Sequence, residues 1–192
     1  MIAVKKIVKK FDQKTVLNNV SFEIGDVGAF AIVGRSGIGK TTLLRLIAGL
    51  DIPDEGSITT ASAKIAYKFQ EPRLMNWLTA LENVAIVVDD KSNALNHART
   101  WLEAVGLPDA ADLYPDQLSG GMQQRVALAR ALAFEGDVLL LDEPFSAVDE
   151  ETKSGLLSLI KQYANTHAVV LVTHDHDEIE ALDATVIPLL DA

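Results

Sequence analysis

The sequence predicts an α/β fold, and three observations carry that prediction. Two apolar runs, residues 138–141 and 168–173, lack polar alternation, which is typical of parallel strands covered on both faces. A short apolar strand at residues 29–33 leads through a glycine-rich loop into a helix at residues 40–50. Between these parts, residues 79–134 read as mostly helical. A helical block is therefore expected to be inserted into a strand-containing core.

The remaining elements follow from alternation and turn signals. Two strands, at residues 2–8 and 16–24, flank the polar turn at 12–14 and form a strand-rich N-terminal part. The alternating segments 58–60 and 64–69 suggest a small hairpin. A helix at 150–164 and a last strand at 185–190 complete the pattern.

Composition and charge exclude several classes of protein. Hydrophobic residues make up 48% of the 192 residues, enough for a substantial core in one domain. No apolar stretch of ~18 residues is free of charge and the first residues lack a signal-peptide core, so a cytosolic protein is expected. The chain has no cysteine, which excludes disulfides and thiolate metal sites. A net charge of −10 argues against nucleic acid as a partner.

Residues 34–41 match the phosphate-binding pattern G-x-x-x-x-G-K-[ST] without deviation. Glycines let backbone N–H groups approach phosphate oxygens, and the helix that follows adds the positive end of its dipole. We expect Lys40 to reach the β- and γ-phosphates and the Thr41 hydroxyl to bind Mg²⁺. A plain glycine-rich turn is the alternative, and the strand before the loop and the helix after it disfavour that reading. The residues expected to bind nucleotide here are Gly34, Arg35, Ser36, Gly37, Ile38, Gly39, Lys40, Thr41 and Thr42.

Two carboxylates, Asp142 and Glu143, follow the buried strand at 138–141. Ligands of open α/β sheets bind at the carboxyl ends of the strands. Asp142 is suited to hold Mg²⁺, and Glu143 can orient or deprotonate an attacking water. An acidic surface turn is the alternative, which the nearby phosphate loop makes less attractive.

A second loop with two adjacent glycines, in Leu-Ser-Gly-Gly-Met-Gln-Gln-Arg at residues 118–125, runs directly into an apolar-periodic helix. Its exposed backbone amides form another anion-binding helix start. Two phosphate cradles in one small domain are explained if the chain works as a pair, with each copy closing the nucleotide site of the other.

Together these motifs resemble the nucleotide-binding subunit of ATP-binding-cassette (ABC) transporters, over essentially the whole chain. The resemblance implies a P-loop NTPase with a RecA-like core, an N-terminal antiparallel β subdomain and an inserted helical subdomain. It implies one ABC-type ATPase domain over residues 1–192, with the core at about 1–70 and 135–192 and the helical subdomain at about 71–134. ATP and Mg²⁺ are the implied cofactors.

The same resemblance implies roles for single residues. Phe11 would stack on adenine, and Gln70 would sense Mg²⁺ and the attacking water. Asp149 belongs to a loop that crosses the dimer interface, and His174 would contact the γ-phosphate and brace Glu143. The implied catalytic residues are Glu143, His174 and Gln70, the implied metal ligands are Thr41, Gln70 and Asp142, and the residues implied to contact the opposite protomer's ATP are Ser119, Gly120 and Gly121.

The segment 70–84 places bulky apolar residues, among them Trp77, in a Pro-containing loop before a helix. Core packing of the helical block is one interpretation. The other is a groove that receives a short helix of an integral membrane permease subunit. The tryptophan is similar to that of importers for sulfonates, taurine, nitrate and related solutes. The expected partners are then a second ATPase subunit in a homodimer, the permease and a solute-binding protein, with the chain peripheral on the inner face of the membrane.

Three departures from the family pattern concern regulation and partner geometry. The chain ends just after the last strand, residues 182–185 lack the Asp-Arg pair often found before that strand, and the region 57–64 looks trimmed. Two other functions remain compatible with the sequence. One is a soluble ABC-type ATPase in a non-transport assembly role, which usually has long insertions, duplicated cassettes or basic surfaces. The other is a P-loop kinase or GTPase, which has no use for residues 118–125.

Overall fold

The computed structural model describes residues 1–60 and 63–190. Its centre is a five-stranded parallel sheet with the order β5-β6-β7-β3-β8. The strands run over Ile65–Lys68 (β5), Val138–Asp142 (β6), Ala168–Val172 (β7), Gly28–Val33 (β3) and Thr185–Pro188 (β8). Every residue of β6 and β7 is buried, as their unbroken apolar sequences predict.

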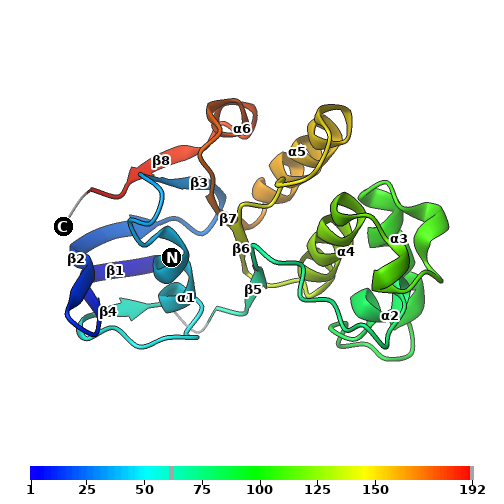
Figure 1. The fold of residues 1–192 in the computed structure, drawn as a ribbon, viewed down its shortest axis with the longest axis horizontal. Helices are drawn as coiled ribbons and strands as arrows, with labels where there is room; N and C mark the ends of the chain where they lie inside the picture. Colours follow the sequence, from blue (N-terminus) through cyan, green and yellow to red (C-terminus); the bar gives the residue numbers. More distant parts are fainter. Residues whose placement is uncertain (61–62, 191–192) are drawn as a thin grey trace.

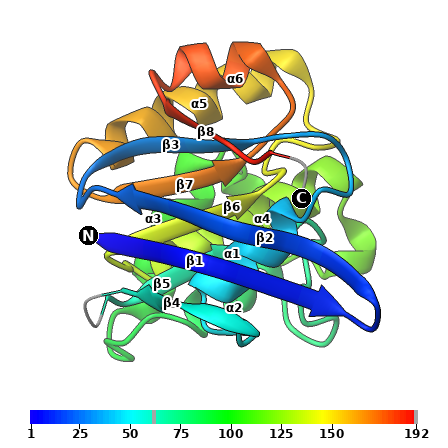
Figure 2. The ribbon, with the colours of Figure 1, turned by 90° about the vertical axis from the view of Figure 1, so that its left-hand side faces the viewer.

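A three-stranded antiparallel sheet with the order β2-β1-β4 lies beside this core. Its strands are Ile2–Phe11 (β1), Lys14–Ile24 (β2) and Glu55–Thr59 (β4). Figure 2 looks onto β1 and β2, with helix α1 (Lys40–Ile47) behind them. The apolar face of α1 packs in one cluster with residues of β1 and β2 and with alternate residues of the parallel sheet, such as Leu140 and Val170.

The other face of the parallel sheet packs on the helices. Leu139 and Leu141 of β6 belong to a second cluster, because successive side chains of a strand point to opposite faces. That cluster contains residues of α5 (Glu150–Ala164) and of the helical block, which Figure 1 shows on the opposite side of the molecule from β1 and β2. The block consists of α2 (Ala80–Ala85), α3 (Ala94–Ala104), α4 (Gly120–Ala133) and two short 3-10 turns at Pro108–Ala110 and Pro115–Gln117.

The predicted hairpin over residues 58–60 and 64–69 is wrong. Strand β4 pairs with β1 in the antiparallel sheet, and β5 pairs in parallel with β6. Alternation specifies that a segment is a strand but not its partner, and β6 needs a neighbour on that side to pair its backbone groups. Residues 61–62 of the proposed turn lie outside the described residues.

A short helix, α6 (His176–Ala181), was not predicted. It follows β7 directly, and the Asp175 side chain caps it by accepting a hydrogen bond from the backbone N–H of Asp177, 2.9 Å away. The last strand, β8, ends at Pro188 rather than at residue 190. Among the described residues, none of the helices has the length and apolar character needed to cross a bilayer.

Candidate active site

A cavity of about 360 Å³ lies at the carboxyl ends of the parallel strands. It brings together segments that are far apart in the sequence, from the ends of β1, β3, β5, β6 and β7. The residues that line it are Phe11, Val16, Ser36, Gly37, Gly39, Lys40, Thr41, Thr42, Gln70, Glu143 and Val172. Phe11 is 48% exposed at the end of β1, so its ring faces this opening without being part of the core.

The glycine-rich loop between β3 and α1 forms one wall of the cavity. Gly39 has a φ of 110°, and a Cβ atom at this position would lie 2.7 Å from Val16 Cγ1, so only glycine fits. The Lys40 ammonium donates to the carbonyl oxygens of Gly34 at 2.8 Å and Arg35 at 3.0 Å. An ammonium has three donors, so a phosphate oxygen can accept the third. The N-terminus of α1 opens onto the same space.

The Asp142 carboxylate lies behind this loop. Its Oδ1 accepts a hydrogen bond of 3.2 Å from the Thr41 hydroxyl, and its Oδ2 lies 3.5 Å from the donating Tyr67 hydroxyl. Burial raises the pKa of Asp142. Hydroxyl and carboxylate oxygens at one point form the kind of donor set that Mg²⁺ prefers, so these residues fit that ion.

Glu143 adopts a strained backbone conformation with a φ of 43°. Its N–H donates to Val172 O at 3.0 Å, which fixes the end of β6 against β7. Its carboxylate accepts a hydrogen bond of 3.1 Å from the Gln70 side-chain amide. The structure thus brings Glu143 and Gln70, both predicted site residues, into direct contact.

Lys68 was not among the predicted site residues. The structure buries its side chain, which is only 1% exposed. Its ammonium donates to Glu143 O over 3.4 Å. Burial lowers the pKa of Lys68 to about 8, although the carboxylates of Asp142 and Glu143 act in the opposite direction. The signal was the alternation of β5, in which Lys68 shares a face with the buried Ala66.

His174 follows β7 and does not line the cavity of about 360 Å³, which is called the larger cavity below. It lines a neighbouring cavity of about 170 Å³ together with Glu143, which belongs to both. Thr173, Asp175, Lys153 and Glu178 line the same smaller cavity. His174 is thus adjacent to the predicted catalytic carboxylate, on the side of α5 and α6.

The Ser-Gly-Gly segment begins helix α4. The Ser119 hydroxyl caps the helix by accepting a hydrogen bond of 3.3 Å from Met122 N–H. A Cβ atom at Gly121 would lie 2.6 Å from Ala147 O, so this glycine permits close packing on the loop before α5. Asp149 caps α5, with its carboxylate accepting from Thr152 N–H at 2.9 Å.

These segments stay apart from the nucleotide-site candidates within one chain. Among the described residues that line the larger cavity, none belongs to the Ser-Gly-Gly segment or to the loop that carries Asp149. The structure thus brings Phe11, the phosphate loop, Gln70 and Glu143 together, but not residues 119–121 or Asp149.

The loop between Gln70 and α2 is held from two sides by residues that the sequence analysis did not single out. Gln124 of α4 donates to Gln70 O at 2.9 Å, and Arg130 of α4 donates to Pro72 O at 2.8 Å. Asn83, with 0% exposure, donates through its amide to three carbonyls of residues 75–79 and accepts from Met75 N–H. The anchored loop leaves Trp77 75% exposed.

Comparisons of the sequence and of the fold with known proteins both point to ABC transporter proteins. The ABC transporter family pattern matches residues 17–146. The aliphatic sulfonates import ATP-binding protein SsuB 1 of Pseudomonas syringae pv. syringae (strain B728a) is 46% identical over 176 residues, which cover 88% of this chain and 72% of that protein. The corresponding SsuB 2 of Frankia alni (strain DSM 45986 / CECT 9034 / ACN14a) is 44% identical over 192 residues, covering 99% of this chain and 77% of that protein.

Two solved structures are similar over nearly the whole fold. A dimeric bacterial ABC transporter cassette matches with a TM-score of 0.88 and 32% identity, covering 98% of this chain and 94% of the other. A dimeric ATP-binding cassette in a post-hydrolysis state bound to ADP and Pi matches with a TM-score of 0.87 at the same identity and coverage. The fold class predicted from the sequence is therefore confirmed.

Proposed function

Because this chain belongs to the ABC transporter family and is an ATPase, we propose that it powers solute import as one of two identical subunits that enclose ATP between them. One observation carries the pairing. The cavity that holds the phosphate loop and Glu143 contains no residue of the Ser-Gly-Gly segment among the described residues. A second copy, placed head to tail, can supply Ser119, Gly120 and Gly121 to that cavity. The dimeric state of the two similar cassettes supports this arrangement.

The residues of the cavity divide the work of hydrolysis. Phe11 stacks on the adenine, and the phosphate loop with Lys40 holds the triphosphate. Bound through Thr41, Asp142 and Gln70, Mg²⁺ would supply charge neutralisation at the phosphate oxygens. Glu143 orients and deprotonates the attacking water, and its hydrogen bond with Gln70 holds the carboxylate in place. His174 braces Glu143 and contacts the γ-phosphate.

Closure of the pair completes the electrostatic stabilisation. The exposed N-terminus of α4 brings backbone N–H groups and a positive dipole end to the partner's γ-phosphate. Asp149 lies at the start of α5 in the loop that meets the partner. The closed state binds ATP better than ADP, so hydrolysis shifts the population back to the open state.

The proposed import role and cargo come from the relatives. Proteins that are 46% and 44% identical are named as ATP-binding proteins for aliphatic sulfonate import. We propose a small sulfonate, taurine or nitrate-like solute, delivered by a solute-binding protein. The chain would act in the cytoplasm, held on the inner face of the membrane by its permease.

The proposed permease contact is the loop around Trp77. A large indole that is 75% exposed on a loop fixed by Asn83 and Arg130 supports a docking role over core packing. Trp77→Ala is therefore expected to abolish co-purification with the permease and leave ATP binding unchanged. Ile52→Ala, which removes another exposed apolar side chain, serves as the control and should leave the complex intact. Retention of the complex by Trp77→Ala would assign the indole to packing.

The test of the catalytic proposal is Glu143→Gln. This variant should bind ATP with wild-type affinity but hydrolyse it ~100-fold or more slowly, because the amide cannot accept a proton. It should accumulate as a dimer in the presence of ATP, measured by light scattering. Glu103→Gln, an exposed change on α3, is the matched control. Wild-type turnover in Glu143→Gln, or a specific activity of the native chain that does not fall on dilution, would contradict the proposal.

A further inference from the structure

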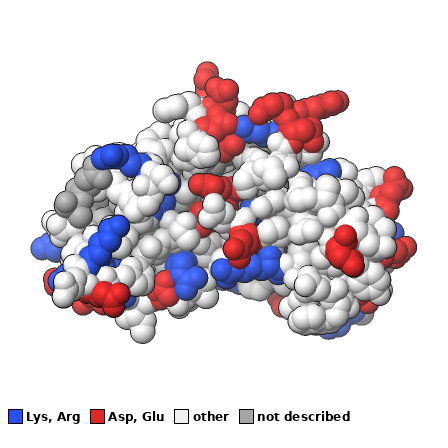
Figure 3. Space-filling view, viewed as in Figure 1, with Lys and Arg blue, Asp and Glu red and all other residues white. Residues whose placement is uncertain are grey.

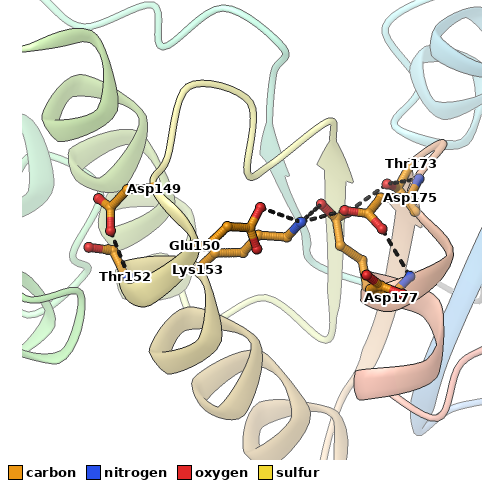
Figure 4. Close-up of polar contacts among 8 residues, drawn as sticks. Asp149, Glu150, Thr152, Lys153, Thr173, Asp175 and Asp177 are labelled. Atoms are coloured by element: carbon orange, nitrogen blue, oxygen red, sulfur yellow. Dashed lines mark hydrogen bonds and ion pairs between the residues drawn. The ribbon is translucent and has the colours of Figure 1, made fainter.

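A group of charged side chains, of which Lys153 and Glu178 are buried, joins helix α5 to the segment that carries His174. Lys153, in the first turns of α5, is 8% exposed. Its ammonium contacts Asp175 and lies 3.2 Å from Glu178 Oε1 and 3.7 Å from Glu150 Oε1. Figure 4 shows the Lys153 side chain extending from α5 toward Asp175. An ammonium has three donors, so it can serve all of these carboxylates. Asp and Glu side chains gather over α5 and α6 along the upper edge of the molecule, and basic side chains lie among them (Figure 3).

Both neighbours of His174 are attached to this group. The Thr173 hydroxyl donates to Glu178 Oε2 at 2.6 Å, and Asp175 N–H donates to the same hydroxyl at 3.1 Å. Asp175 contacts Lys153 and also caps α6. His174 itself is exposed and lies outside these bonds. The backbone on either side of the imidazole is therefore fixed, and the ring remains accessible.

The group of charges that contacts Thr173 and Asp175 is connected at its other end to the start of α5. Asp149 caps this helix, and Lys153 lies one turn later, with its N–H donating to Asp149 O at 2.8 Å. The position of Asp149 is thus connected through one helical turn and one ammonium to the position of His174. Lys153, His174 and Glu143 all line the cavity of about 170 Å³. A shift of the Lys153 contacts therefore changes the geometry between His174 and Glu143.

We propose that Lys153 is a positioning residue for ATP hydrolysis. It holds His174 beside Glu143, and it links the position of His174 to the position of the loop that carries Asp149. This inference rests on the proposed roles of His174 and Asp149. Hydrogen bonds to Asp175 and Glu178 raise the pKa of Lys153 against the lowering effect of burial, so the ammonium stays charged at neutral pH.

The experiment compares steady-state ATPase kinetics of the full chain with Lys153→Met, Lys153→Arg, His174→Ala and the double variant Lys153→Met/His174→Ala. We expect Lys153→Met to lower kcat ~10-fold or more with the KM for ATP changed less than ~2-fold, because displaced groups lose orientation and not substrate binding. Lys153→Arg should restore most of kcat. In the His174→Ala background, Lys153→Met should cost less than ~2-fold further, because the two act as a unit.

Lys161→Met is the matched control, since Lys161 lies on the exposed face of the same helix, and it should leave kcat unchanged. If Lys153→Met fails to fold, Lys153→Met/Glu178→Gln replaces it, because that pair leaves one fewer unpaired carboxylate. An unchanged kcat in Lys153→Met, or a full second loss in the double variant, overturns the inference. A His174→Ala chain with wild-type kcat instead overturns the proposed role of His174, and the two failures are thereby distinguished.

Discussion

Replacing the buried Lys68 by methionine is expected to stabilise the chain near neutral pH. The fall of the Lys68 pKa from 10.5 to about 8 means that the folded state binds this proton less tightly than the unfolded state. At 1.36 kcal/mol for each pKa unit, the difference corresponds to about 3 kcal/mol. The penalty is fully present below pH 8, where both states carry the charge, and it disappears above about pH 10.5, where both are neutral.

The other consequences of Lys68→Met are small by comparison. The hydrogen bond that is lost is long, at 3.4 Å, and its acceptor, Glu143 O, also accepts from the Ser146 hydroxyl at 3.1 Å. A hydrogen bond of this kind contributes about 1 kcal/mol or less. Methionine has a similar length and fills the space with apolar atoms. The net stabilisation is therefore expected to be about 2 kcal/mol at pH 7.

The assay is urea unfolding of the wild type and Lys68→Met at pH values between about 7 and 10.5. The difference in unfolding free energy should be largest at the lowest pH and should shrink steadily above pH 8. Lys161→Met, an exposed change, should give no difference at either end of the range. A destabilised Lys68→Met at pH 7, or a difference that does not change with pH, would refute the argument that burial holds an unfavourable charge here.

Two further changes test the packing around the site. Asn83→Ala is expected to destabilise the helical block by about 3 kcal/mol, because three carbonyls of the loop at 75–79 lose their donor. Asn96→Ala, a change at an exposed position, should cost little. Hydrogen exchange of α2 and urea unfolding measure both effects. Gly121→Ala should lower the melting temperature, since its Cβ would lie 2.6 Å from Ala147 O. Gly120→Ala, which has open space, should leave it unchanged or slightly raised, and the opposite order would count against the observed packing.

The phosphate loop, Asp142 and Glu143 could be predicted from local patterns as neighbours at one edge of the sheet. The phosphate loop, Asp142 and Glu143 are each defined by neighbours within a few residues and by the buried strand that precedes them. The ends of parallel strands meet at one edge of the sheet, so the sequence order alone brings these segments close together. The phosphate loop and Glu143 line one cavity with Gln70 and Phe11, and Asp142 contacts that loop through Thr41.

The rest depends on contacts between distant segments. Alternation could not tell that β5 pairs with β6, which begins 70 residues after the end of β5. The contacts of Lys153 with Asp175 and Glu178 leave no local signal, because they depend on the packing of separate elements. For Lys68 the alternation of β5 was a signal, but its contact with Glu143 depends on the pairing of β5 with β6. Helix α6 was detectable in principle, since Asp175 precedes an acidic first turn, but its six residues are too few for a clear period.

The anchored loop between Gln70 and Trp77 has a mechanical consequence. Seven residues of fully extended chain could span roughly 25 Å, enough slack for either end to move independently. Hydrogen bonds from Gln124, Arg130 and Asn83 remove that slack. These bonds tie the loop to α2 and α4, so a displacement of the indole would be transmitted to both helices and to the backbone of Gln70. Removing these hydrogen bonds should therefore leave ATP hydrolysis intact but uncouple it from movement at the proposed permease contact.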